Sequence, residues 1–217
     1  MNPTERYSRQ RDLVPAERLG TCRITIVGAG AIGRQIALQL AAMGAASLQL
    51  VDFDSVEESN LASQGYLQDD LGRQKVHATA DLCQQINHSL ETVECDERFR
   101  RSMAVGNVLF CAVDSIETRK LIWAAVKDRT AFFADTRMNA EVVRVLTACD
   151  PAGRQHYPGT LFDAREAHAG SCTAKSTVYT ANIAAGLAIG QLTKWLRGIP
   201  ADKDITLNLL SSELTCQ

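Results

Sequence analysis

A glycine-rich turn between a strand and a helix constrains the fold of this chain most strongly. Residues 24–27 (ITIV) form a β-branched run that leads into GAGAIG at 28–33, and apolar side chains then recur with helical spacing. Gly28, Gly30 and Gly33 match GxGxxG, where glycines permit a tight turn, close approach of phosphate to backbone N–H groups and tight helix packing. The pattern predicts a nucleotide-binding strand, turn and helix.

An acidic residue supports this reading. A second strand at 48–51 ends at Asp52, 19 residues after Gly33. A carboxylate at that place accepts a hydroxyl of a bound ribose. Together these features favour a nucleotide site over a purely structural glycine-rich turn, and they do not identify which nucleotide is bound.

The rest of the chain keeps alternating between strand and helix patterns. Helices are predicted over 75–86, 116–126 and 173–197, and strands at 92–95, 108–113, 131–134, 141–148 and 205–210. Such alternation is typical of a Rossmann-like, doubly wound α/β fold with a mostly parallel sheet and helices on both faces. The last helix and strand are expected as a C-terminal extension.

The chain is expected to form a single domain of four parts. These are an N-terminal arm (1–23), a nucleotide-binding core (24–149), a mobile crossover loop (150–171) and the C-terminal helix and strand (172–217). The arm has too little apolar content to fold back into its own core. Loops of about twenty residues in compact domains are usually functional or disordered.

Composition excludes several classes of protein. With 25 acidic and 23 basic side chains the net charge is -2, so no basic surface for nucleic acid is expected. The charged first dozen residues do not resemble a signal peptide, and the uncharged run 176–193 reads as a buried helix rather than a membrane span, so we expect a cytoplasmic protein. Seven cysteines without a CxxC pair predict a chain without structural zinc.

Four further motifs occur in a distinctive order. They are RYSRQ at 6–10, DFDSVEESNL at 52–61, LGRQK at 71–75 and a strand ending in Asp114, CAVD at 111–114. With the glycine turn, this order resembles the ThiF/MoeB family of ubiquitin-activating-type (E1-like) adenylating enzymes. The resemblance runs across nearly the whole chain.

The resemblance implies that the nucleotide is ATP with Mg²⁺. Asp52 would hold the ribose, Asn60 and Lys75 would face the phosphates, and Asp114 would hold the magnesium ion. Arg9 would reach the terminal phosphates from a second subunit of a homodimer. The residues implied in cofactor binding are Gly28, Gly30, Gly33, Asp52, Asp54, Asn60 and Lys75.

The residue types suit that chemistry on their own terms. A carboxylate that attacks the α-phosphate of ATP needs the phosphate charge neutralised, which calls for a hard cation on an acid and for Lys or Arg near the oxygens. Each candidate also has a simpler interpretation. Lys75 could be an exposed lysine at a helix start, Asp114 a helix N-cap and Arg9 a surface charge.

One position departs from the family pattern. Ser63 stands where SNLxRQ has an arginine that contacts the triphosphate, and serine cannot supply a cationic fork. Three alternatives remain open: reduced activity, substitution by another cation such as Arg73 or a partner's arginine, and loss of adenylation.

Cys172 lies just before the last predicted helix, where several family members carry a cysteine that accepts the activated acyl group. A helix N-terminus and nearby Lys175 would favour its thiolate. The alternative is a surface thiol without a role. His156 and His168 fall in the predicted crossover loop and are interpreted as incidental.

The sequence therefore predicts ATP-dependent adenylation of the C-terminal carboxylate of a small ubiquitin-like or sulfur-carrier protein, with possible acyl transfer to Cys172. One alternative is a catalytically silent scaffold of the same family, which Ser63 motivates. A second is an NAD-dependent oxidoreductase, which rests on GxGxxG and Asp52 alone.

Overall fold

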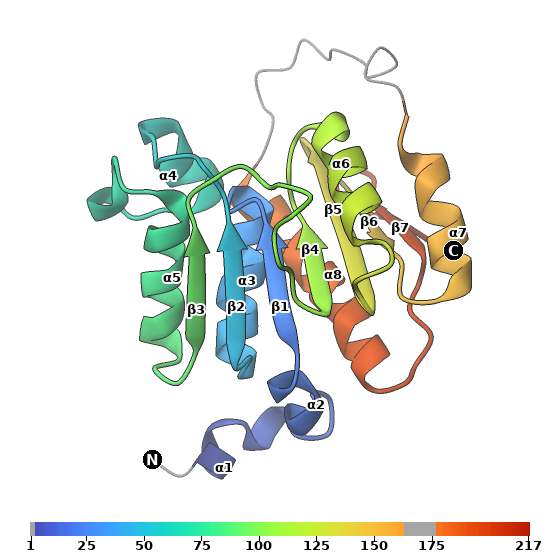
Figure 1. Cartoon of the computed structure of the whole chain (residues 1–217), viewed down its shortest axis with the longest axis horizontal. Coiled ribbons are helices and arrows are strands. Elements are labelled where there is room, and N and C mark those ends of the chain that lie inside the picture. Colours follow the sequence, from blue (N-terminus) through green and yellow to red (C-terminus); the bar gives the residue numbers. More distant parts are fainter. Residues whose placement is uncertain (1–2, 163–176) are drawn as a thin grey trace.

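An eight-stranded sheet runs through the computed structural model, which describes residues 3–162 and 177–217 (Figure 1). Its strands are β1 (Arg23–Val27), β2 (Ser47–Val51), β3 (Glu91–Cys95), β4 (Val108–Cys111), β5 (Phe132–Asn139), β6 (Val142–Thr147), β7 (Asp204–Asn208) and β8 (Glu213–Cys216). The order is β3-β2-β1-β4-β5-β6-β7-β8. The first five strands in this order are parallel, whereas β6, β7 and β8 pair antiparallel. The predicted mostly parallel α/β sheet is confirmed, with an antiparallel extension at one edge.

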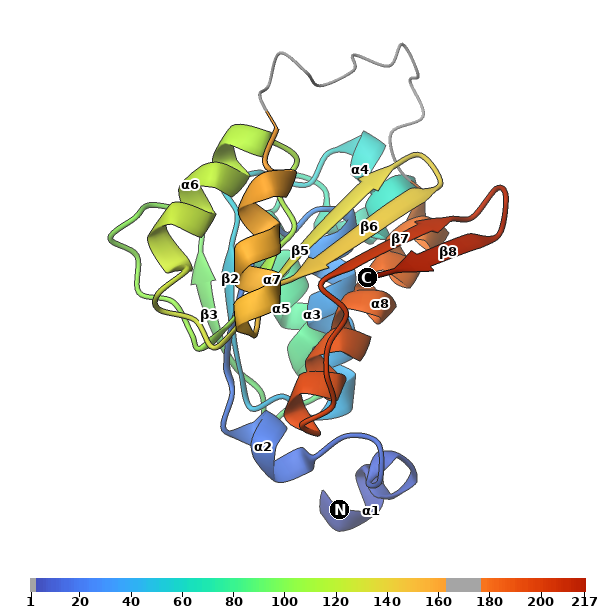
Figure 2. The same ribbon diagram turned by 90° about the vertical axis from the view of Figure 1, so that its right-hand side faces the viewer.

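Helices cover both faces of this sheet (Figures 1 and 2). They are α1 (Pro3–Arg6), α2 (Ala16–Gly20), α3 (Ala31–Met43), α4 (Glu58–Gln64), α5 (Lys75–Ile86), α6 (Ile116–Val126), α7 (Pro151–His156) and α8 (Val178–Leu196), with short 3₁₀ turns η1 (Ser8–Gln10), η2 (Gln68–Asp70) and η3 (Tyr157–Thr160). Helices α3, α5 and α8 lie on one face, and α6 and α7 lie on the other. In the described part of the chain, no helix is both long and apolar enough to cross a membrane.

The alternation of side chains along buried strands builds two cores. On β4, Phe110 points to the α3 and α8 side while Leu109 points to the α6 side, because successive strand residues face opposite ways. On the α6 side Trp123 packs edge-on against Phe133 and Tyr157, with ring centroids 5.0 and 4.8 Å away. Both faces of the central strands are therefore buried, as a parallel sheet requires.

Strongly periodic segments match their predicted positions. Helices over 75–86 and 116–126 have the predicted bounds as α5 and α6, and the strands of the first half lie within one or two residues of prediction. The predicted helix over 173–197 is present as α8, and its first expected residues lie outside the described part. Strand β8 was not predicted, because a run of only four residues is too short to show a clear pattern, and all four are exposed.

The predicted crossover loop over 150–171 is wrong for its first half. Residues 151–160 form α7 and η3 instead. Asp150 caps α7 by accepting a hydrogen bond from the Gly153 amide at 2.7 Å, and Pro151 occupies the first turn, where proline is well tolerated. Residues 163–171, which include His168, lie outside the described residues.

The expectation of an arm that does not enter its own core also needs correction. Val14 and Leu19 are buried in the core beneath α3. Upstream of them, the side-chain amide of Gln10 donates to the Met43 carbonyl at the end of α3 at 2.7 Å. The N-terminal segment therefore packs on its own chain, at the end of the sheet where the parallel strands begin (Figure 1).

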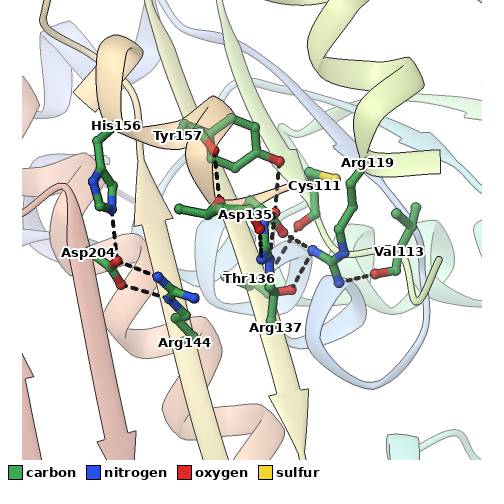
Figure 3. Close-up of polar contacts among 11 residues, drawn as sticks. Cys111, Val113, Arg119, Asp135, Thr136, Arg137, Arg144, His156, Tyr157 and Asp204 are labelled. Carbon is green, nitrogen blue, oxygen red and sulfur yellow. Dashed lines mark hydrogen bonds and ion pairs between the residues drawn. The ribbon is translucent and has the colours of Figure 1, made fainter. Parts of the chain in front are cut away.

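A buried carboxylate ties the antiparallel extension to α7 (Figure 3). Asp204 on β7 accepts two hydrogen bonds from Arg144 on β6, at 2.9 and 2.6 Å, and pairs with Nε2 of His156 at 2.8 Å. Burial alone would raise the pKa of Asp204, but the hydrogen bonds from Arg144 and His156 outweigh it and lower the pKa below its ordinary value. The ionised carboxylate therefore stabilises the fold.

We expect Asp204→Asn to lower the free energy of unfolding by about 1–2 kcal/mol at neutral pH, because two charge-assisted bonds are lost. Since the folded-state pKa is lowered, the difference from wild type should persist above pH 3.8 and disappear as the pH falls further. Denaturant unfolding at several pH values measures this. Asp202→Asn is the matched control, because its pair with Lys194 is partly exposed and should contribute less. An equal loss in both variants would contradict the assignment.

Candidate functional site

The glycine turn lies where the carboxyl ends of β1 and β4 meet. Gly28 has a φ of 96°, and a Cβ atom there would lie 2.7 Å from the carbonyl oxygen of Ala112. A Cβ atom at Gly33 would overlap the carbonyl oxygen of Gly28. At Gly30, by contrast, the nearest atom to an added Cβ is 3.8 Å away. Two glycines are thus required for packing, whereas a side chain at the third would make only an ordinary van der Waals contact.

The start of α3 beside Gly30 is suited to an anion. Gly30 is the N-cap of this 13-residue helix and supplies no side-chain cap, so N–H groups of the first turn remain available. Next to Gly30, Oε1 of Gln64 is buried and has no hydrogen-bond partner among the described residues. The open face of Gly30 and the uncapped helix together fit the phosphates of a nucleotide.

Asp52 is fixed against this turn. One oxygen of its carboxylate accepts a hydrogen bond from the Ala29 amide at 2.6 Å, and the other accepts one from the Asp54 amide at 2.9 Å. Burial raises the pKa of Asp52, and these two hydrogen bonds together with the charge of Lys75 oppose the rise. The carboxylate therefore stands at the end of β2 beside the glycine turn, as the sequence predicted.

Lys75 is buried at the start of α5, so its interpretation as an exposed lysine is wrong. Its side chain is 8% exposed, and Nζ lies 3.2 Å from the carboxylate of Asp54. The hydroxyl of Tyr66 donates to the Ala29 carbonyl at 2.6 Å and also lies 3.4 Å from the Lys75 carbonyl. Tyr66 thus links the glycine turn to α5, and Asp54 orients the lysine.

Asp114 lies at the same edge, two residues after Ala112. Its interpretation as an N-cap is wrong, because Ser115 caps α6 by accepting a hydrogen bond from the Thr118 amide at 3.3 Å. The exposed carboxylate of Asp114 is therefore left without a capping role.

A buried ionic cluster holds the turn that carries Asp114 (Figure 3). Asp135 on β5 is fully buried and pairs with Arg119 of α6 and with Arg137, the latter at 2.8 Å. The Tyr157 hydroxyl donates to Asp135 at 2.8 Å. Arg119 also donates to the carbonyl of Val113, the residue before Asp114. The cluster therefore fixes the backbone of this turn.

These residues fit a magnesium ion only with help from phosphate oxygens. Among residues 3–162 and 177–217, no group of three or more histidine, cysteine or acidic side chains is placed to hold a metal. Mg²⁺ typically binds through one or two carboxylates, substrate phosphates and waters. Asp114 beside the glycine turn is compatible with that arrangement.

The polar residues of α4 are occupied locally. The Asn60 side-chain oxygen accepts the Glu57 amide at 3.0 Å in a capping box, and Ser63 donates to the Ser59 carbonyl at 2.8 Å. Arg73, suggested as a substitute cation, binds Asp70 at 3.0 Å and also pairs with Asp81. Arg73 is therefore engaged on the surface by two carboxylates.

One predicted residue, Arg9, is not brought to this site within its own chain. Arg9 is exposed on η1, next to Gln10 and the C-terminal end of α3. Because α3 has 13 residues, it separates Arg9 from the glycine turn by roughly 20 Å. Cys172 lies outside the described residues.

Sequence reasoning missed three supports of the site: Tyr66, Arg119 and Asp135. Each acts through a partner distant in sequence, Asp135 for example through Arg119, 16 residues earlier in the chain. A weak signal was present, because Asp135 is an acid that directly follows the apolar run at 131–134 (AFFA).

The sequence of this chain is similar to those of known proteins. A profile of the ThiF family matches residues 7–215. The chain is 35% identical over 129 residues to adenylyltransferase and sulfurtransferase MOCS3-1 of Zea mays, covering 54% of this chain and 27% of that protein. It is 34% identical over 129 residues to the SAMP-activating enzyme E1 of Haloferax volcanii, covering 54% of this chain and 48% of that enzyme. The chain thus spans at most about half the length of these curated relatives.

Solved structures share the fold. E. coli MccB has a TM-score of 0.83 at 16% identity, with 100% of this chain and 70% of MccB covered. PaaA has a TM-score of 0.79 at 23% identity, with 99% of this chain and 82% of PaaA covered. MccB with AMPCPP and MccA has a TM-score of 0.79 at 16% identity, with coverages of 100% and 72%. At these identities the likeness concerns the fold alone.

We expect Gly33→Ala to destabilise the protein by about 3 kcal/mol or more, because the added methyl group forces α3 away from the Gly28 carbonyl. Gly30→Ala, the matched control, should change the unfolding free energy by less than about 1 kcal/mol, because its methyl group would make only an ordinary van der Waals contact. Denaturant unfolding of both variants tests the pair. Wild-type stability in Gly33→Ala would mean that α3 is not seated on β1 as described.

Proposed function

The chain belongs to the ThiF family, and from this premise we propose that it adenylates the C-terminal carboxylate of a small ubiquitin-like or sulfur-carrier protein with ATP. The observation that carries the proposal is the junction of β1, β2 and β4. There the uncapped start of α3, the fixed Asp52, the buried Lys75 and the free carboxylate of Asp114 lie on one edge of the sheet.

The residues of this edge divide the work of binding ATP. The N–H groups beside Gly30 receive phosphate oxygens, and Asp52 accepts a ribose hydroxyl. Lys75 supplies a cation next to the phosphates, and Asp54 keeps its ammonium group oriented. Asn60 on α4 is assigned to the phosphates by the family resemblance. These assignments rest on the family resemblance, and the side-chain chemistry and placement of Asp52 and Lys75 support them.

In the proposed step, a carboxylate oxygen of the carrier attacks the α-phosphorus of ATP. A new oxygen–phosphorus bond forms, the bond from the α-phosphorus to the bridging oxygen of the β-phosphate breaks, and pyrophosphate leaves with that electron pair. Asp114 would hold Mg²⁺, which would neutralise charge on the phosphates. Lys75 stabilises the charge that develops on the leaving group.

Relatives support the kind of acceptor. MOCS3-1 of Zea mays is named an adenylyltransferase and sulfurtransferase, and the Haloferax volcanii protein is named a SAMP-activating enzyme. Both names denote activation reactions, and MccB has been crystallised with AMPCPP and MccA. Transfer of the activated acyl group to Cys172 stays a prediction, because that residue lies outside the described part of the chain.

The two alternative functions are not equally supported. Family membership removes the basis of the NAD-dependent oxidoreductase, because that reading rested on GxGxxG and Asp52 alone. The silent scaffold retains a specific observation, the absence of a cation at Ser63. It is distinguished from the enzyme by measuring turnover.

Pyrophosphate exchange tests the proposal. Purified protein should exchange labelled pyrophosphate into ATP only when a sulfur-carrier protein ending in Gly-Gly is present, because adenylation needs the free carboxylate. Asp114→Asn should reduce the exchange rate by about a hundredfold or more, since the carboxylate facing the phosphates is lost.

Glu117→Gln is the matched control for that variant. Glu117 lies three residues further on, in the first turn of α6, and pairs with Lys120 on the surface at 2.9 Å. It should exchange at the wild-type rate. Undiminished exchange in Asp114→Asn would overturn the site assignment, and ATP binding without exchange for any carrier would favour the scaffold.

A shared active site is part of this proposal. Arg9 lies beside the far end of α3, so it does not reach the glycine turn of its own chain. It is exposed and therefore available to a neighbouring subunit. In a two-fold symmetric dimer each Arg9 would serve the partner's phosphates.

Mixing two variants tests the shared site. Arg9→Ala and Asp114→Asn homodimers should both be inactive in exchange. Mixing them in equal amounts should recover about one quarter of wild-type activity, because half of the dimers are mixed and each has one intact site. Near-normal exchange by Arg9→Ala alone would identify Arg9 as a solvated surface charge instead.

A further inference from the structure

A fully buried arginine lies directly behind the glycine turn. Arg34 follows Gly33 in the first turn of α3 and has an exposed fraction of 0%. None of its three side-chain nitrogens has a hydrogen-bond partner in the described part of the chain. A buried charge without hydrogen bonds is costly, so such a group needs a physical explanation.

The surroundings of Arg34 compensate its charge incompletely. The nearest carboxylate oxygen belongs to Asp70, 3.9 Å away, which is beyond hydrogen-bond distance. Asp70 already accepts hydrogen bonds from Arg73 and from the Leu67 amide, each at 3.0 Å. Burial lowers the pKa of the Arg34 guanidinium, in agreement with poor solvation of its charge.

One aromatic ring separates this cation from the turn. The guanidinium carbon of Arg34 lies 4.4 Å from the ring centroid of Tyr66. The hydroxyl of the same ring donates to the Ala29 carbonyl, in the middle of GxGxxG, at 2.6 Å. Arg34 therefore lies behind the surface that would receive phosphate, where low-dielectric surroundings screen its field weakly.

We propose that Arg34 is a positioning residue whose buried charge attracts the polyphosphate of the nucleotide to the glycine turn, and that the bound polyphosphate completes the compensation of that charge. This inference rests on the proposed function. Ser63 carries no charge, and Arg73 is held by two carboxylates, whereas Arg34 makes no hydrogen bond to a carboxylate. Arg34 acts through the turn without touching the ligand.

The test measures binding of α,β-methylene ATP, ADP and adenosine by calorimetry. Arg34→Met should weaken binding of the ATP analogue by about tenfold or more, because a unit charge about 10 Å away still contributes that much at the effective dielectric of a protein. The loss should be smaller for ADP and absent for adenosine. The melting temperature of the nucleotide-free variant should stay unchanged or rise, because an incompletely compensated charge is removed.

Three further variants make the result decisive. Arg73→Gln removes an exposed cation that shares Asp70 and should bind all three ligands like wild type. If Arg34→Met does not fold, Arg34→Lys and Arg34→Gln replace it: the charged lysine should keep most of the affinity for the ATP analogue, and glutamine should lose it.

Three results would overturn the inference: unchanged affinity without the charge at position 34, an equal loss for adenosine and the ATP analogue, or the same loss in Arg73→Gln. If wild type binds none of these ligands, the proposed function itself fails. That outcome is distinct from binding that is equal in wild type and Arg34→Met.

Discussion

The site depends on the close approach of α3 to the ends of β1 and β4. Gly33 sits against the Gly28 carbonyl, and Gly28 sits against the Ala112 carbonyl, so a side chain at either position would separate these elements. This contact brings three things to one edge: the free N–H groups of α3, the carboxylate of Asp52 and the turn bearing Asp114. The order β3-β2-β1-β4-β5 reverses direction between β1 and β4, which is where ligands bind in doubly wound sheets.

Much of this arrangement could be predicted from local sequence pattern. Buried strands such as β1 and β4 are apolar runs, and α3, α5 and α6 repeat apolar residues with helical spacing, so burial dictates both type and bounds. Segments without such a pattern were missed. Helix α7 starts with proline and contains glycine, and it is specified by the Asp150 cap and by burial of Tyr157 rather than by periodicity. Strand β8 is set by pairing with β7.

The candidate site was predicted in identity but not in detail. Spacing singled out Asp52 and the family resemblance singled out Lys75 and Asp114, whereas the burial and hydrogen bonding of these side chains depend on partners far along the chain. Lys75 is buried because Asp54, 21 residues earlier, receives its ammonium group. Nothing local to Arg34 distinguishes it from an exposed helix arginine, because its burial depends on Tyr66 and α5 closing over it. Long-range pairing of this kind is not encoded in any window of sequence.

The carboxylates near the site differ in their hydrogen-bond and ion-pair partners, and this difference indicates which role each of them can play. Asp135 is fully buried and is bound by two arginines and a tyrosine, so it contributes rigidity and is closed to a ligand. Asp52 accepts two backbone hydrogen bonds, which fix its position while leaving lone pairs free for a hydroxyl.

Asp114 does not cap α6, because Ser115 does so, and Arg119 holds the turn that carries Asp114. A carboxylate that is positioned through its backbone while its oxygens stay exposed can take up a divalent cation without first breaking an internal bond. The buried charges of the Asp135 cluster therefore support the exposed one, because they provide the rigidity that the exposed carboxylate of Asp114 cannot provide for itself.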